Sequence, residues 1–169
     1  CLDVLAGRGR DLAGKHVVVT AGGTREFLDP VRFLGNRSSG RQGYAIASAA
    51  AVRGATVTLI AANSGLAAPA GVSVVPVVTT EEMRQATLSA SAVADAVVMA
   101  AAPADFRPIH VAGAKMKKAD DGSSPSIELE QNPDILLELV RTRVSPAQVI
   151  VGFAAETGDV NGSVLDHAQ

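Results

Sequence analysis

The stretch HVVVTAGGT, residues 16–24, decides the fold of this chain. A short run of β-branched residues that ends in glycines is typical of a strand buried on both faces and followed by a tight turn. Further along, residues 41–53 are rich in alanine and place apolar side chains at helical spacing, and Gly54 follows as a helix stop. A strand, a turn and a helix in this order indicate the first βα unit of an α/β protein.

The rest of the chain repeats this alternation. Strands are expected at 56–61, 72–78, 96–101 and 149–154, and helices at 79–91, at 132–143 and from residue 160. Pro76 marks an edge strand or a strand end, and Pro133 is expected at the first position of its helix. Residues 103–130 break the pattern and predict a loop or β-flap with a strand-like patch at 126–130. Alternating strands and helices predict a mostly parallel sheet, whose ligands lie at the carboxyl ends of the strands.

Composition narrows the class of protein. With 169 residues and 47% hydrophobic side chains, the chain has enough apolar surface for one domain with one core. A formal net charge of -2 does not favour nucleic acid or an anionic membrane as partner. The single cysteine, Cys1, cannot form an internal disulfide, and no run approaches the roughly 18 apolar residues that span a bilayer. We therefore expect a soluble cytoplasmic protein.

Two segments after the first strand suggest a phosphate site. GGTR at 22–25 and NRSSGRQG at 36–43 place Ser38, Gly40 and Gly43 around a helix start, where free backbone N–H groups and the helix dipole favour phosphate. Residues 22–43, which include both segments, have neither the GxGxxG spacing of dinucleotide sites nor the GxxxxGK[ST] motif of a P-loop. The alternative is an ordinary βα turn with a serine cap.

Two residues of the same region are candidates for binding a carboxylate substrate. The amide of Asn36 is suited to donate to a carboxylate or to an oxyanion of acyl transfer, although a lone loop asparagine is often only a turn residue. The guanidinium of Arg32 is suited to grip an anion with two hydrogen bonds, and a solvated surface arginine is the alternative.

Two further candidates lie after the strand expected at 96–101. Asp105, in AAPADFRP, follows small residues that leave room for a ligand, and its carboxylate is suited to hold a substrate hydroxyl or a divalent cation. Its alternative role is to cap a turn. Lys115 begins the run KMKK at 115–118, which is suited to close over phosphates, and a solvated surface run is the alternative.

The last candidates surround the final helix and strand. NPDI at 132–135 offers a helix N-terminus for polar recognition, and Phe153 offers an aromatic face for a nucleotide base. Helix capping and core packing are the respective alternatives.

Taken together, the strings GGTRE, DPVRFLGNRSSGRQG, AAPADFRP, KMKK, NPDIL and VGFAAET occur in the order seen in one family. The chain resembles the phosphopantothenoylcysteine synthetases. The resemblance covers residues 11–169 and implies a Rossmann-like three-layer fold that binds CTP and Mg²⁺, with residues 1–10 as the remnant of a linker from an N-terminal flavin-dependent decarboxylase. It also implies a homodimer, and a C-terminal portion beyond residue 169. In this chemistry the carboxylate of 4'-phosphopantothenate attacks the nucleotide α-phosphate to give an acyl-cytidylate and pyrophosphate, and cysteine then displaces CMP to form an amide.

The same resemblance implies roles for individual residues. Asn36 acts on the substrate carboxyl region and Lys115 on the nucleotide, and both are the expected catalytic residues. The remaining expected nucleotide contacts are Ser38, Gly40, Gly43, Asp105, Asn132, Pro133, Asp134, Ile135 and Phe153. The expected phosphopantothenate contacts are Arg32, supplied by the neighbouring subunit, together with Asn36, Ala101, Ala102 and Asp105, and Asp105 is also the expected metal ligand. Pro103 stands where family members often have valine, which stiffens the backbone before Asp105.

Two other functions remain open from the sequence. A glycine turn after the first strand is also found in NAD(P)-dependent oxidoreductases, although their fingerprint is missing and no acidic residue follows the strand at 56–61. A non-catalytic nucleotide-binding or dimerisation module is the other alternative.

Overall fold

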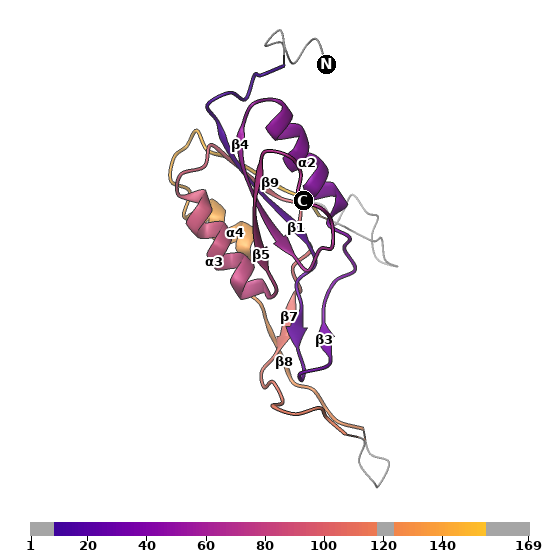
Figure 1. Cartoon of the computed structure of the whole chain (residues 1–169). Helices are drawn as coiled ribbons and strands as arrows, with labels where there is room; N and C mark the ends of the chain where they lie inside the picture. Colours follow the sequence, from indigo (N-terminus) through magenta and orange to yellow (C-terminus); the bar gives the residue numbers. More distant parts are fainter. Residues whose placement is uncertain (1–8, 118–123, 155–169) are drawn as a thin grey trace, which may run out of the picture.

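The computed structural model describes residues 9–117 and 124–154, and its centre is a five-stranded parallel sheet (Figure 1). The strands lie in the order β5-β4-β1-β6-β9, and every neighbouring pair is parallel. Their bounds are His16–Gly22 for β1, Thr56–Ala62 for β4, Val72–Val77 for β5, Ala96–Met99 for β6 and Val149–Gly152 for β9. The predicted α/β fold with a mostly parallel sheet is confirmed, and β5 with its Pro76 is an edge strand, as expected.

Helices pack on both faces of the sheet, as the Rossmann-like three-layer fold requires. The helix α2 (Arg41–Val52) packs against one face, where its alanines meet Val17 and Val19 of β1. The helices α3 (Thr80–Ser91) and α4 (Ile135–Arg141) pack against the other face, around Val18. Successive residues of a strand point to opposite faces, so one β-branched run supplies both cores.

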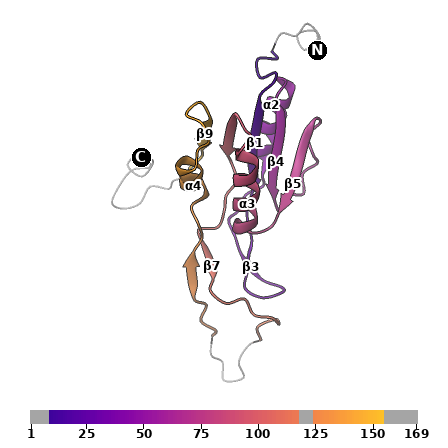
Figure 2. The same ribbon diagram turned by 90° about the vertical axis from the view of Figure 1, so that its left-hand side faces the viewer.

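Two small antiparallel pairs extend from the carboxyl end of the sheet (Figures 1 and 2). One pair, β7 (Phe106–Pro108) with β8 (Leu129–Gln131), forms the base of the expected β-flap. The other pair, β2 (Glu26–Phe27) with β3 (Phe33–Leu34), lies between β1 and α2 and was not predicted. Both therefore stand at the end of the sheet where ligands bind in folds of this kind.

The ends of several elements differ from the prediction. β6 stops at Met99 rather than residue 101, because the Ala101 N–H donates to Thr20 Oγ1 (3.1 Å) instead of continuing the ladder. β9 stops at Gly152 rather than residue 154, and the expected helix from residue 160 lies outside the described residues.

The helix predicted at 132–143 is shorter at both ends. Asp134 is its N-cap and accepts from the Leu137 N–H at 2.9 Å, so Pro133 precedes the cap instead of holding the first helical position. The helix ends at Arg141, and the next residue, Thr142, turns its hydroxyl back to the Glu138 carbonyl. Among the helices of the described residues, none has the length and apolar character to cross a membrane.

Candidate active site

A cavity of about 590 Å³ opens at the carboxyl edge of the sheet, between the end of β6, the start of α4 and the end of β9. Its lining includes these residues that the sequence predicted: Ala101, Asp105, Asn132, Pro133, Asp134, Ile135 and Phe153. They come from three segments that are distant in sequence. The structure thus brings together most of the predicted nucleotide contacts, with the carboxylate of Asp105 and the ring of Phe153 both exposed.

A buried polar network holds one wall of this cavity. The hydroxyls of Thr24 and Thr80 lie 2.8 Å apart, and Thr24 Oγ1 accepts from the Ala104 N–H at 2.8 Å. Asn132 Nδ2 donates to the Ala104 carbonyl (2.9 Å), and the Asn132 N–H donates to the Asp105 carbonyl (2.8 Å). These bonds join the loop after β1, the start of α3, the loop after β6 and the NPDI segment. The sequence placed Thr24 in the GGTR segment and Thr80 at a helix start, but it did not predict that the two hydroxyls meet in a buried wall.

Asn132 has an unused acceptor beside the cavity. Its Oδ1 is the buried side-chain polar atom that lacks a hydrogen-bond partner within the described part of the chain. Nearly all buried polar atoms in folded proteins have hydrogen-bond partners. Because Asn132 lines the cavity, its Oδ1 is available to accept a hydrogen bond from a ligand there.

Asn36 lies next to the cavity loop without lining the cavity. Its Nδ2 donates to the Pro103 carbonyl at 2.8 Å, and Pro103 is itself a lining residue. The NRSSG and AAPAD segments, which follow different strands of the sheet, therefore meet here. One amide N–H of Asn36 is already engaged, and its action on a substrate stays a prediction.

The start of α2 has the character of an anion site. Gly40 is its N-cap in the left-handed region (φ 75°), α2 has no side-chain cap hydrogen bond and no acidic residue in its first turn, and Arg41 is its first residue. Two serines beside this N-cap do engage main-chain N–H groups: Ser38 Oγ accepts from Gly40 at 3.3 Å and Ser39 Oγ from Arg41 at 3.4 Å, so the alternative of a turn with serine caps stays open. Gly43 is buried against β1, where packing alone requires glycine.

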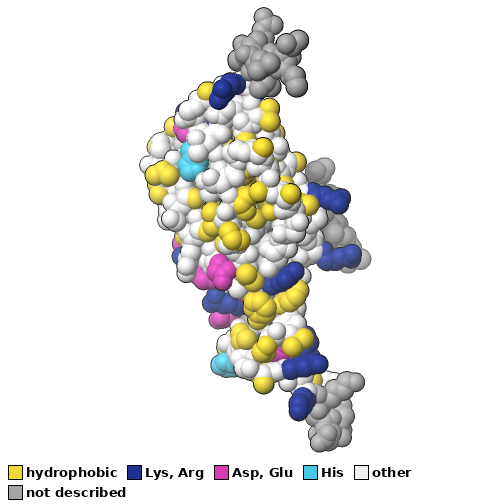
Figure 3. Space-filling model, in the orientation of Figure 1, with side chains coloured by type: hydrophobic (Ala, Val, Ile, Leu, Met, Phe, Trp, Pro, Cys, Tyr) yellow, Lys and Arg dark blue, Asp and Glu magenta, His cyan; other side chains and the backbone are white. Residues whose placement is uncertain are grey.

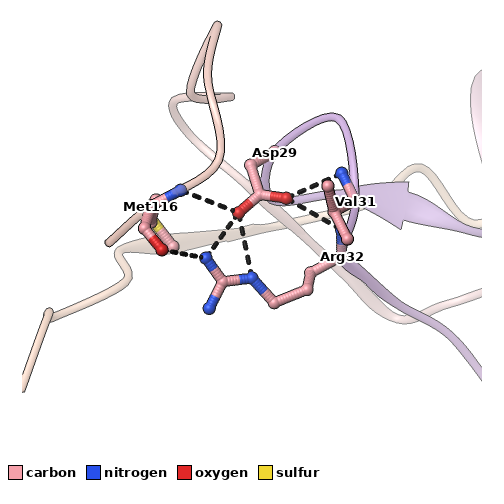
Figure 4. A network of polar contacts seen from close by, with 4 residues as sticks. All are labelled: Asp29, Val31, Arg32 and Met116. Atoms are coloured by element: carbon pink, nitrogen blue, oxygen red, sulfur yellow. Dashed lines mark hydrogen bonds and ion pairs between the residues drawn. The ribbon is translucent and has the colours of Figure 1, made fainter. Parts of the chain in front are cut away.

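Arg32 and the flap meet at a buried carboxylate, Asp29 (Figure 4). Arg32 donates to Asp29 through Nε (2.9 Å) and Nη2 (2.6 Å), and Nη2 also donates to the Met116 carbonyl (2.7 Å). Burial opposes the ionisation of Asp29, but the N–H groups of Val31, Arg32 and Met116 that donate to it outweigh burial and hold its pKa far below the usual range. Lys115 adjoins Met116 and does not line the cavity.

Most of the predicted site residues thus lie in three places: the cavity, the start of α2 with Ser38, Gly40 and Gly43, and the flap cluster around Asp29. Dark-blue Lys and Arg side chains lie around the flap end of the face shown in Figure 3. The sequence signal for a turn at Asp29 was available, since an aspartate followed by proline favours the start of a turn. It went unused because nothing local indicates that Met116 shares the carboxylate.

An ion pair between helices holds the start of α4. Arg84 of α3 donates from Nε and Nη2 to Glu138 of α4, both at 2.6 Å, and from Nη1 to Glu81 at 3.0 Å. The side-chain hydrogen bond from Arg84 lowers the pKa of Glu138 despite partial burial. This bidentate contact fixes α4, and with it the NPDI segment, against α3.

The carboxylates of the described residues suit a metal ion only where a bound ligand, such as a nucleotide, supplies the remaining oxygen atoms. Within residues 9–117 and 124–154, no group of three or more His, Cys, Asp or Glu side chains is placed to hold a metal ion. Mg²⁺ in nucleotide sites usually takes one or two carboxylates together with phosphate oxygens and waters. Asp105, an exposed carboxylate in the cavity, fits that pattern.

Comparison with known proteins identifies the family. The model of the family described as "DNA/pantothenate metabolism flavoprotein C-terminal domain" matches residues 12–169. The chain belongs to this family. Its similarity to curated members is high: it is 57% identical over 164 residues to the coenzyme A biosynthesis bifunctional protein CoaBC of Mycobacterium tuberculosis (strain ATCC 25618 / H37Rv), covering 94% of this chain. It is 48% identical over 150 residues to the CoaBC of Bacillus subtilis (strain 168), covering 88% of this chain.

These relatives are longer, and the chain spans 39% of the first and 36% of the second. Among solved structures, the crystal structure of the C-terminal domain of a CoaBC is 40% identical and has a TM-score of 0.74, over 89% of this chain and 69% of that one. A Cab2 mutant in complex with phosphopantothenate-cysteine has the same fold, with a TM-score of 0.71 at 19% identity, over 94% of this chain and 71% of that one. Membership of the DNA/pantothenate metabolism flavoprotein C-terminal domain family accounts for the fold.

Proposed function

We propose that this chain is the phosphopantothenate–cysteine ligase part of a bifunctional protein of coenzyme A biosynthesis, and that it uses CTP. The observation that carries the proposal is the cavity, which gathers Asp105, the NPDI segment and Phe153 in a member of a family whose curated relatives are named for coenzyme A biosynthesis. In this cavity the exposed ring of Phe153 is suited to contact a nucleotide base, and the carboxylate of Asp105 is suited to bind the cation that accompanies the nucleotide.

The reaction requires the attacking carboxylate oxygen, the α-phosphorus and the leaving pyrophosphate oxygen to lie in line. Activation is needed because a free carboxylate has no usable leaving group. In the proposed reaction a carboxylate oxygen of 4'-phosphopantothenate attacks the α-phosphorus, the bond to pyrophosphate breaks, and the cysteine amine then displaces CMP. The start of α2, whose N-cap Gly40 has no side chain and whose first turn has no acidic residue, is suited to phosphate, and Asn36 donates to the carbonyl of the cavity residue Pro103.

The remaining roles follow the same proposal. Mg²⁺ bound with the nucleotide at Asp105 would offset phosphate charge, Lys115 would act on the departing pyrophosphate, and Ala101 and Ala102 would leave room for phosphopantothenate. A cytoplasmic homodimer, with Arg32 serving the neighbouring subunit and a flavin-dependent decarboxylase on the N-terminal side, completes the proposed assembly.

The oxidoreductase alternative is disfavoured by the connection after β1. In dinucleotide-binding folds a short glycine turn joins the first strand directly to its helix. Here β1 ends at Gly22 and α2 begins at Arg41, with the β2–β3 hairpin between them. No observation on the described residues favours a non-catalytic module, and measurement of pyrophosphate release distinguishes it from the ligase.

The test is pyrophosphate release by the intact protein with 4'-phosphopantothenate, cysteine, Mg²⁺ and either CTP or ATP. We expect release with CTP and amide formation in step with it. The variant Asn36→Asp separates the two half-reactions: it is expected to keep pyrophosphate release and to lower amide formation by about a hundredfold, the usual effect of losing one oxyanion donor. Nucleotide binding without release would support the non-catalytic module, and equal amide yield would remove Asn36 from the mechanism.

A further inference from the structure

Within the basic flap segment at residues 115–117, Met116 makes the hydrogen bonds to the β2–β3 hairpin, and earlier in the flap the Ala112 N–H donates to the Leu28 carbonyl at 2.9 Å. The Met116 N–H donates to Asp29 Oδ2 at 3.1 Å, and the Met116 carbonyl accepts from Arg32 Nη2 at 2.7 Å. Both main-chain groups of Met116 are thus used by the hairpin, across 87 and 84 positions of sequence. Lys115 and Lys117, on either side of it, are exposed.

Asp29 divides its two oxygens between two tasks. Oδ1 accepts from the Val31 and Arg32 main-chain N–H groups, both at 2.8 Å, and so builds the turn between β2 and β3. Oδ2 accepts from the Arg32 guanidinium and from Met116, and so closes the contact between hairpin and flap. The Asp29 side chain is 0% exposed, so these charge-assisted bonds are shielded from water and strong.

We propose that Asp29 is a positioning residue that joins the Arg32 guanidinium and the Lys115–Lys117 segment into one unit for anion binding. The inference rests on the proposed function, in which Arg32 and Lys115 serve two different anionic substrates, phosphopantothenate and CTP. One carboxylate orients both groups through the hydrogen bonds that Asp29 Oδ2 accepts from Arg32 and Met116, which we call the latch. Loss of the latch should therefore weaken the binding of both substrates together.

The energetic reason is the cost of ordering. A lysine-bearing segment without regular secondary structure loses backbone and side-chain freedom when it closes on a ligand. Fixing Met116 at both main-chain groups removes much of that freedom before the ligand arrives. The same bonds use Nε and both Nη2 protons of Arg32, so they fix the direction of the remaining donor, Nη1, for an anion.

The variant Asp29→Asn should break the hydrogen bonds that Oδ2 accepts from Arg32 and Met116 while keeping those of Oδ1 that build the turn. An asparagine oxygen can still accept from Val31 and Arg32, whereas its NH₂ group would face the donors of the Arg32 guanidinium and Met116. In the intact protein we expect the KM values for CTP and for phosphopantothenate each to rise about tenfold, the effect of losing a charged hydrogen bond, with a smaller change in kcat. Without ligands, we expect the Met116 amide to exchange its hydrogen faster.

Asp95→Asn is the matched control. Asp95 is a carboxylate that accepts from the His16 N–H (2.8 Å) and from Lys15 Nζ (2.9 Å) at the opposite end of the sheet. The control is expected to leave both KM values and the exchange of the Met116 amide unchanged. If Asp29→Asn does not fold, Met116→Pro, which removes the N–H that reaches Asp29 and leaves the hairpin intact, is expected to give the same paired rise in KM.

The outcomes distinguish this inference from the proposed function. No pyrophosphate release by the wild-type protein would refute the function, while the exchange of the Met116 amide would still test the latch. With an active wild type, an unchanged pair of KM values, or a rise in only one of them, would overturn the coupling. Unchanged amide exchange in Asp29→Asn would overturn the latch itself.

Discussion

Gly43 shows how a single residue sets the distance between layers. A Cβ added there would lie 2.6 Å from both the Ala21 Cβ and the Thr20 carbonyl oxygen. Both atoms belong to β1, whose backbone is held on each side by a neighbouring strand. The helix α2 can therefore lie this close to the sheet only with glycine at that point, and its start is placed accordingly at the end of β1.

Replacement of Gly43 by alanine tests this packing. We expect Gly43→Ala to lower the free energy of unfolding by about 1–3 kcal/mol, the usual cost of overpacking a core. Urea denaturation of the intact protein measures it. The control Gln42→Ala, exposed in the same turn, should change it by less than about 0.5 kcal/mol. Equal stability of Gly43→Ala and wild type would show that α2 shifts freely.

At the scale of elements, the start of α3 supports the site directly. Thr79 Oγ1 accepts from the Glu82 N–H at 3.2 Å, and Glu82 Oε2 accepts from the Thr79 and Val78 N–H groups, which completes a capping box. The next residue, Thr80, is buried, and its N–H donates to the Glu26 carboxylate at 2.8 Å. A local cap thus places the threonine on which the cavity wall depends.

Removing the cap hydroxyl should loosen this start. Thr79→Ala is expected to cost about 1 kcal/mol of stability, typical of a lost N-cap, and to increase amide exchange at the first turn of α3. Calorimetry and hydrogen exchange on the intact protein measure the two effects. Thr79→Ser keeps the hydroxyl and serves as the control. A loss of equal size in both variants would assign the effect to the methyl group instead.

At the scale of the whole molecule, carboxylates with lowered pKa join segments that are far apart in sequence. They are Asp11 with Arg53, Asp95 with Lys15, Asp29 with Arg32 and Met116, and Glu138 with Arg84. Each pKa is lower in the folded than in the unfolded chain, so the unfolded chain binds more protons as pH falls. The stability from these groups is fully present above their unfolded pKa values, near 3.9 for Asp and 4.3 for Glu, and is lost as pH falls through the folded values.

We therefore expect the Tm of the intact protein to be nearly constant from about pH 7 to pH 5.5 and to fall steadily from about pH 5 to pH 3. Thermal unfolding at a series of pH values measures this. In Glu138→Gln, one titrating group is removed, so the fall should be shallower than in wild type. Parallel curves would mean that the contact between Arg84 and Glu138 persists in the unfolded chain or contributes nothing.

The fold was accessible from sequence because its signals are local. β-branched runs at 16–20 and 56–61 and the alanine-rich helix at 41–53 show their periodicity directly, and strands alternating with helices leave few arrangements other than a parallel sheet. The β2–β3 hairpin was missed because two-residue strands carry no period. The end of β6 at Met99 was missed because a distant side chain, Thr20, accepts from the Ala101 N–H there, and no local signal in the sequence marks the end of β9 at Gly152.

By itself, then, the sequence determined the order of the main helices and of the five parallel strands, and which motifs follow those strands at the carboxyl edge of the sheet. Only the tertiary structure decided which of them share a site: it joined Asp105 to the NPDI segment and Phe153, and it joined Arg32 to Met116 through Asp29. Periodicity and capping act over a few residues and can be seen in the chain, whereas a hydrogen bond across 87 positions depends on how distant segments pack. The partners of a buried carboxylate exist only once the chain has folded around it.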